Sequence, residues 1–340
     1  MKVPFLIKHL CSLGLTAFAF LSTINCYSYH TRESDEPHLP PPTPPGPWFT
    51  GPLIAPSAHV ISRGHFNIEP YLYYTLRYGQ FGPNWKGHSL PENIHSLNLQ
   101  VPVQIGLSKK IDFTFSPQGF YSWTKSQSSW EVGDLPFGFD FQLLSDQPDK
   151  WWPAIRSSLK ITAPVGKFEH LDPRKNGIDG VGNGSWMPEI DLVFGRLFHF
   201  SGVHYLNTRY SIAYVFPITT HVHGYNIYGG GHGTNGSVKS GNILSADIGL
   251  EYSLTQNWVL ALDIFYQHFD RSTFHGKRGK DADGNPNKIG TPSNEQFSLA
   301  PAFEYNWNAN LGIIAGVWFT YAGRNSSEFV SGIVAYNIYY

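Results

Sequence analysis

The sequence is short of cysteine, of charge and of long apolar runs, and each shortage excludes a class of protein. Its only cysteines, Cys11 and Cys26, lie near the N-terminus, so the rest of the chain has no cysteine pair for a disulfide scaffold. Charged residues make up 14% of the chain, against roughly a quarter in soluble domains, so much of the surface need not face water. The net charge of −1 gives no basic footprint, and no nucleic-acid partner is expected.

Apolar runs of about 18 residues or more are missing, so membrane-spanning helices are excluded and a membrane role would have to use strands. At the N-terminus, Lys2 and Lys8 precede a shorter apolar run at 10–21, which small and polar residues follow. This pattern predicts a secretory signal peptide over 1–26, with cleavage near Cys26–Ser28. In the alternative, Cys26 is lipidated, although Thr-Ile-Asn before it makes a poor lipidation signal.

A proline-rich segment over 27–64 follows the signal peptide. It carries four charged residues at 32–36 and then a cluster of prolines at 40–47, a composition that favours an extended and unpacked chain. We therefore interpret residues 28–47 of this periplasmic segment as a tether. The alternative is a plug or a partner-binding peptide.

From residue 65 onward, apolar and polar residues alternate with a period of two, as a strand with two different faces requires. This pattern predicts an all-β fold over 65–340, a transmembrane antiparallel up-and-down β-barrel of about twelve strands. The predicted strands cover 65–78, 96–107, 111–121, 134–144, 154–164, 186–198, 204–216, 242–254, 258–270, 295–305, 311–322 and 328–340.

The connections between these strands sort into two length classes, as in outer-membrane barrels, which have short periplasmic turns and long external loops. A β-sandwich has no reason to sort its loops in this way. The alternation predicts that both termini are periplasmic and that the protein lies in a Gram-negative outer membrane, in contact with lipid and lipopolysaccharide. The predicted long loops cover 79–93, 122–133, 165–185, 217–241 and 271–294.

The last strand carries Val334, Tyr336, Ile338 and Tyr340 on one face and ends on an aromatic residue. This arrangement resembles the C-terminal signal that the barrel-assembly machinery reads, although that signal usually ends in Phe. The machinery is therefore an expected partner.

Charged side chains fall on the strand face opposite the apolar one. Because a charge facing lipid would cost about 2–4 kcal/mol, these residues are expected to line a net acidic lumen. A polar pore with a cation preference and an interior filled by hydrogen-bonded acid–base networks are both consistent with them. The residues are Glu69, Asp112, Asp134, Asp140, Glu189, Asp191, Asp247, Glu251, Asp263 and Glu304, with the bases Arg77, Arg156, Lys160 and Arg209.

Three short passages resemble the outer-membrane family associated with the meta-cleavage pathway of phenol degradation. They are Leu-Lys-Ile-Thr-Ala-Pro-Val-Gly-Lys at 159–167, Gly-Val-Gly-Asn-Gly at 180–184 and Asp-Leu-Pro-Phe-Gly at 134–138. The resemblance implies an outer-membrane channel and says little about its cargo, since no residue here identifies a phenol site.

Two functions remain open. The first is a channel for small solutes, hydrophobic or aromatic compounds among them. The second is a structural or surface-binding barrel that acts through its external loops. An enzyme is not expected, because a barrel phospholipase needs a His–Ser pair with an orienting Asn that the sequence does not show. No cofactor or metal is expected either, and His221, His223 and His232 are interpreted as part of a polar loop.

Overall fold

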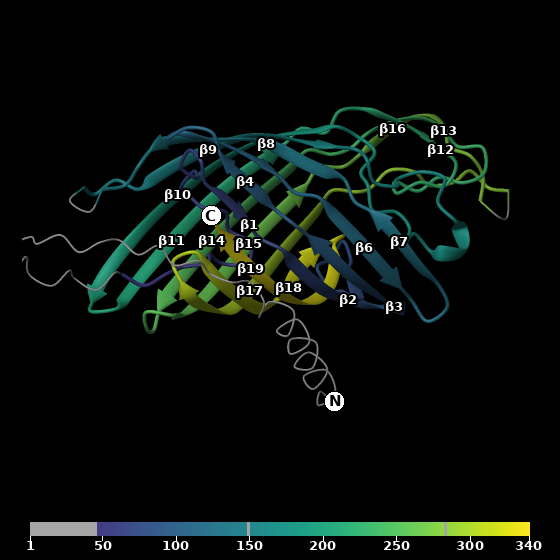
Figure 1. Ribbon diagram of the computed structural model, residues 1–340. Helices are drawn as coiled ribbons and strands as arrows, with labels where there is room; N and C mark the ends of the chain where they lie inside the picture. The colour runs from purple at the N-terminus through teal and green to yellow at the C-terminus, as the bar shows by residue number, and fades with distance from the viewer. Residues whose placement is uncertain (1–45, 148–149, 282–283) are drawn as a thin grey trace, which may run out of the picture. The chain divides into compact units, whose positions relative to one another are not determined.

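A computed structural model describes residues 46–147, 150–281 and 284–340 (Figure 1). They form a closed antiparallel β-barrel of twelve strands, which confirms the predicted fold class. The wall closes where β19 (Ser327–Tyr339) pairs with both β1 (Phe66–Ile68) and β2 (Tyr71–Phe81). The predicted signal peptide and the first part of the proline-rich segment, 27–45, lie outside the described residues. In the described ranges, no helix combines the length and the apolar character that crossing a membrane requires.

Each of the first four barrel strands is divided in two, and the first three divisions coincide with Pro70, Pro102 and Pro117. Proline has no N–H to donate, so the ladder is interrupted at these positions. Neighbouring strands stay joined across the gaps, since Glu69 N donates to Pro102 O at 2.9 Å and Val101 N donates to Pro117 O at 3.0 Å. The other divided strands are β3 (Gly87–Gln100) with β4 (Val103–Gly106), β5 (Ile111–Phe115) with β6 (Gln118–Trp123), and β7 (Ser128–Val132) with β8 (Leu135–Leu144).

The remaining barrel strands run without a break, each close to its predicted range. They are β9 (Ala154–Ala163), β10 (Met187–Ser201), β11 (His204–Val215), β14 (Ile243–Ser253), β15 (Trp258–Phe269), β17 (Asn294–Asn308) and β18 (Leu311–Arg324).

The prediction of long loops over 79–93 and 122–133 is wrong. β2 continues to Phe81 and β3 begins at Gly87, which leaves a turn at 82–86, and β6 and β7 are joined by a turn at 124–127. Pro91 and the polar residues around it interrupt the two-residue alternation, so the sequence pattern does not reveal this part of β3.

The other long connections, 164–186, 216–242 and 270–293, lie together at one end of the barrel, opposite the short turns (Figure 1). They contain a short 3₁₀ helix at Pro173–Lys175 and a second sheet made of β12 (Thr220–His223), β13 (Asn235–Lys239) and β16 (Thr273–Lys277). This second sheet has its own apolar core. The core comprises Val222, Tyr228 and Val238, with Phe168, Ile227, Phe274 and Ile289 packed against them.

The two faces of the barrel wall differ sharply in exposure. The outward face presents large apolar side chains such as Leu99, 53% exposed, and Phe303, 61% exposed, whereas the inward carboxylates Glu251, Asp263 and Glu304 are fully buried. An apolar outer surface on a closed sheet is the arrangement that a lipid environment stabilises.

Candidate functional site: the barrel lumen and its strap

Residues 46–64, which we call the strap, lie inside the barrel against its inward-facing side chains. At one end, Trp48 N donates to Gln256 O at 3.3 Å, and at the other, Gly64 N donates to Gly106 O at 3.2 Å. Both Gln256 and Gly106 lie at short turns. The strap therefore enters and leaves the lumen at the short-turn end of the barrel.

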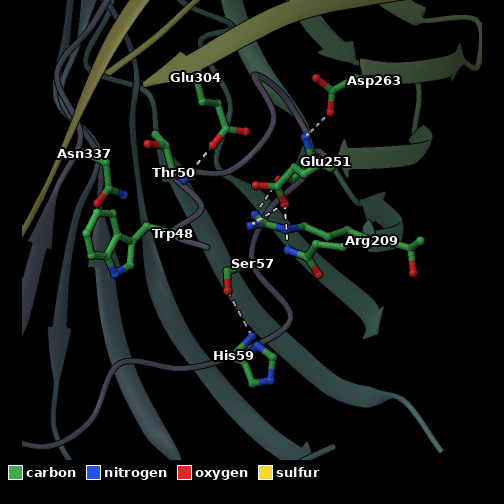
Figure 2. A network of polar contacts seen from close by, with 12 residues as sticks. Trp48, Thr50, Ser57, His59, Arg209, Glu251, Asp263, Glu304 and Asn337 are labelled. Atoms are coloured by element: carbon green, nitrogen blue, oxygen red, sulfur yellow. Dashed lines mark hydrogen bonds and ion pairs between the residues drawn. The ribbon is translucent and has the colours of Figure 1, made fainter. Parts of the chain in front are cut away.

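Buried side chains of the wall accept hydrogen bonds from the backbone of the strap (Figure 2). An isolated carboxylate in such a place would be costly, and these bonds offset part of that cost. The strap has few internal backbone hydrogen bonds, so the wall supplies partners that a strand or helix would otherwise provide. The bonds run from Thr50 N to Glu304 Oε2 (2.7 Å), from Ile54 N and Ala55 N to Asp263 (3.3 and 3.0 Å), from Val60 N to Gln142 Oε1 (2.9 Å) and from Ile61 N to Asp112 Oδ2 (2.9 Å).

Small residues on the inner wall make room for the strap. A Cβ atom on Gly195 would lie 2.5 Å from the Cβ of Ala58, and one on Gly106 would lie 2.0 Å from Ser62 O. Leu53 is the apolar anchor, 4% exposed. Its buried neighbours are Ala261, Ala300, Ala302, Ile314, Ile333 and Ala335.

The tether predicted over 28–47 overlaps the strap only at residues 46 and 47. The charges and most of the prolines that indicated a linker precede the strap, which carries apolar residues such as Trp48, Leu53 and Ile61. The wall supplies both the apolar seat for Leu53 and the acceptors for the strap's N–H groups. For 28–45 the tether stays a prediction.

A cavity of about 610 Å³ lies between the strap and the wall. Strap residues from Phe49 to Ser62 form one side of it, and polar residues such as Asn67, Gln104 and Asn337 line the other. Among the residues predicted to line the lumen, those on this cavity are Glu69, Asp140, Arg156, Lys160, Glu189 and Arg209.

The basic residues on the cavity are paired with acids, but not equally well. Lys160 Nζ lies 2.7 Å from Asp191 Oδ2 and 3.9 Å from Glu189 Oε1. Arg209 Nη2 lies 3.0 Å from Glu251 Oε2, as Figure 2 shows. The third pair, Arg156 Nη1 and Asp140 Oδ2, is 3.8 Å apart, too long for a hydrogen bond.

The other predicted lumen residues have different surroundings. Asp112, Asp263 and Glu304 bind the strap, as described above. Asp247 is 4% exposed, and within the described ranges neither of its carboxylate oxygens has a hydrogen-bond partner. Arg77, on β2, does not line the cavity.

Asp134 lies where the wall meets the connection 164–186. It accepts hydrogen bonds from Gly166 N at 2.9 Å and Asn183 N at 2.6 Å. The sequence predicted that Asp134 lines the lumen, whereas in the structure it binds the backbone of the connection 164–186 where that connection meets the wall.

An ion pair within the connection 164–186 joins Lys167 Nζ to Asp179 Oδ2 at 2.7 Å. Burial by itself would raise the pKa of the Asp179 carboxyl, but hydrogen bonds from Lys167 and from Asp172 N outweigh it and hold that pKa below its usual value. Tyr228 donates from its hydroxyl to Asn183 O at 2.7 Å, and burial raises its pKa to about 12. Both groups therefore keep their usual charge state at neutral pH.

Arg196 and the loop histidines are polar residues that lie away from the cavity. Arg196 falls on the apolar face of β10, and it donates to Lys150 O at 2.8 Å and Trp152 O at 3.1 Å near the strand end. His223 contacts Glu169 at 3.2 Å. In the part of the chain that the structure describes, no three histidine, cysteine or carboxylate side chains converge as metal ligands would.

Sequence reasoning missed the strap's seat, which consists of inward glycines and alanines together with amide side chains. Asn306 accepts from Thr50 Oγ1 at 2.8 Å and donates to Trp48 O at 3.0 Å. A signal was present, since Gly312, Gly316 and Ala302 interrupt the large residues at inward positions. It shows only that the lumen is wide there, and it does not identify the occupant.

Comparison with known proteins found no matching family model and no matching curated protein. Among solved structures, the chain is similar to an outer membrane channel from Pseudomonas putida F1, with a TM-score of 0.64 and 10% identity over 84% of this chain and 98% of that one. A weaker likeness, with a TM-score of 0.42 and 10% identity, links 80% of the chain to 88% of the translocator domain of the autotransporter NalP from Neisseria meningitidis. At these identities the comparison concerns the fold alone. The chain therefore has the fold of an outer-membrane β-barrel.

Proposed function

We propose that the protein is a channel of the Gram-negative outer membrane for small solutes, and that the strap narrows its lumen. The observation that carries the proposal is the cavity of about 610 Å³ inside a closed wall, bounded by a segment that only non-covalent contacts hold there. A volume in this range accommodates a small organic molecule. The polar and net acidic lining suits solutes that keep their hydrogen bonds in transit.

Planar-bilayer recordings of the purified protein would test the channel. The full chain should give discrete conductance steps, and a variant with residues 47–62 replaced by a Gly-Ser linker of equal length should conduct several-fold better. Since that linker lacks Leu53 and the ordered backbone, it should leave the lumen. A silent wild type together with a silent variant, both correctly folded by circular dichroism, would refute the proposal.

Further proposals follow from the proposed location in the outer membrane. We propose that residues 1–26 direct export and that Val334, Tyr336, Ile338 and Tyr340 are read by the barrel-assembly machinery. We also propose that the chain is a member of the phenol-pathway channel family, and that lipid and lipopolysaccharide surround its apolar belt. Fractionation of cells that express the chain, with N-terminal sequencing of the membrane form, would test export. Replacing Tyr340 by Gly should lower the amount of assembled barrel.

A surface-binding barrel is a second candidate, which the second sheet favours. Its separate core and its exposed basic residues, such as Lys277, Arg278 and Lys280, would suit recognition at the long-loop end. Removing β12, β13 and β16 while rejoining the barrel strands distinguishes the two functions. Conductance should survive in a channel, whereas any binding to cells or glycolipid should be lost in a surface-binding barrel.

A further inference from the structure

Arg156 differs from the other two cations on the cavity. Lys160 and Arg209 each have an acidic partner within 3.0 Å, and Arg209 also donates to Ala55 O at 3.4 Å. The acid beside the Arg156 guanidinium, Asp140, is 3.8 Å away, and Arg156 Nε has no hydrogen-bond partner among the described residues. Its side chain is nevertheless only 2% exposed.

A buried guanidinium without hydrogen bonds is unusual, because each of its five N–H groups loses a bond to water on burial. Arg156 Nε is buried with no partner in the described part of the chain. Asp140 does not supply the missing hydrogen bond. Its Oδ2 lies 3.8 Å from Arg156 Nη1, and its Oδ1 accepts a hydrogen bond from Ser158 Oγ. The site therefore has an unused donor, Nε, on a guanidinium of the kind that binds ligand carboxylates.

Arg156 lines the cavity together with Lys160, two inward positions further along β9. Lys160 Nζ uses one donor on Asp191 at 2.7 Å and is 20% exposed, so a second cation is available nearby. The acids on the cavity, Glu69, Asp140 and Glu189, oppose any large accumulation of negative charge. This balance favours an anion with a single carboxylate.

The rest of the cavity offers room for an apolar body. The rings of Tyr71 and Tyr73 line it and stack with centroids 5.7 Å apart, and Tyr339 lies on it as well. Pro52 and Ile54 of the strap form the facing side. These residues provide flat apolar contacts for the body of a small organic acid while Arg156 binds its carboxylate.

We propose that Arg156 is a carboxylate-binding residue, and that the cavity takes small monocarboxylates with an aromatic or aliphatic body. The assignment of small monocarboxylates as transported solutes rests on the proposed channel function. The binding site itself can be tested without conduction.

Equilibrium dialysis of the purified full-length protein in a neutral detergent tests the site, with benzoate, benzyl alcohol and benzylammonium as probes of equal size and different charge. Benzoate should bind the wild type best. Replacing Arg156 by Gln should weaken benzoate binding at least about tenfold and leave benzyl alcohol unchanged, because the substitution removes charge-assisted hydrogen bonds. Arg156→Lys should retain part of the affinity.

Arg77→Gln is the matched control, since Arg77 also lies on a barrel strand but not on the cavity, and its benzoate affinity should equal that of the wild type. Arg156→Gln could fail to fold because Asp140 loses its partner. In that case the double variant Arg156→Gln with Asp140→Asn restores the charge balance, and it should still lose benzoate affinity. Equal benzoate affinity in wild type and variants, or tighter binding of benzylammonium, would overturn the site even in a protein that conducts. Benzoate binding in a protein that does not conduct would leave the site standing and refute the channel.

Discussion

The strap and the second sheet are the two parts of the molecule that fold beside the barrel wall rather than in it, and they are stabilised in opposite ways. The strap forms hydrogen bonds mainly with wall side chains such as Asp263 and Glu304, and its apolar anchor, Leu53, packs on wall alanines. The second sheet pairs its own strands and packs its own core around Val222 and Val238.

Because of this difference, a substitution in the strap should not affect the second sheet, and a substitution in the second sheet should not affect the strap. The strap depends on the wall for its stability, so damage to either side of the contact should release it from the wall and open the lumen. The second sheet should lose order locally, with little consequence for the lumen. Substitutions in one part, matched by substitutions in the other, test this independence.

Leu53→Ala should have the largest effect. Truncating a buried leucine typically costs about 2–5 kcal/mol, and here the loss falls on the docking of the strap rather than on the barrel. Single-channel conductance should rise towards that of the strap-replaced protein, with frequent transitions as the strap leaves and returns. Val222→Ala, in the core of the second sheet, should leave conductance unchanged. Equal effects of the two substitutions would contradict the separation.

Asp263→Asn should loosen the strap to a smaller extent. Asp263 accepts hydrogen bonds from the backbone N–H of both Ile54 and Ala55, whereas an asparagine offers one oxygen and turns an NH₂ group towards the other N–H. We expect a loss of about 1–3 kcal/mol in docking, visible as greater mobility of a spin label placed by Ser57→Cys. Asp247→Asn is the control, because neither carboxylate oxygen of Asp247 has a hydrogen-bond partner in the strap or elsewhere among the described residues. A label equally mobile in both variants would argue against the carboxylate as the anchor.

Lys167→Met should affect only the long-loop end. Lys167 is 35% exposed, so the loss of its pair with Asp179 should cost only about 1 kcal/mol. Because the pKa of Asp179 is lowered in the folded protein, the pair stabilises the loop above the ordinary carboxyl pKa and loses its effect as the pH falls through the folded value, below 3.8. Hydrogen exchange of residues 164–186 should therefore be flat from pH 7 to pH 5, after correction for intrinsic rates, and rise below pH 4. In the variant Asp179 lacks the cation that lowers its pKa, so the rise below pH 4 should be smaller or absent, and identical profiles would refute the assignment.

Tyr228→Phe should have the smallest effect. It removes the hydroxyl that donates to Asn183, which should cost about 0.5–1.5 kcal/mol within the second sheet and its loops. Since burial raises the pKa of Tyr228 to about 12, the bond should persist through pH 10. Protease cleavage in 164–186 should become moderately faster, while conductance stays at the wild-type value. A change in conductance would show that the second sheet and the lumen are coupled.

The sequence predicted the barrel well because strand alternation is a local property. A residue such as Leu99 faces outward and its neighbour Asn98 faces inward whatever the rest of the chain does. The errors at 79–93 and 122–133 arose where Pro91 and polar residues on both faces removed that local signal. The candidate site was harder to predict, since alternation places a charged residue on the inner face but does not identify its partner.

By itself, the sequence determined that the wall consists of about twelve alternating strands, because a period of two leaves each strand one apolar face, and it located three of the long connections. Only the tertiary structure decided what the inward charges do. Asp263 and Glu304 bind a segment more than 200 residues earlier in the chain, and Arg156 lies 3.8 Å from Asp140 with its Nε unpartnered among the described residues. Contacts between residues so distant in sequence depend on closure of the barrel and on the path of the strap, which composition and local periodicity do not encode.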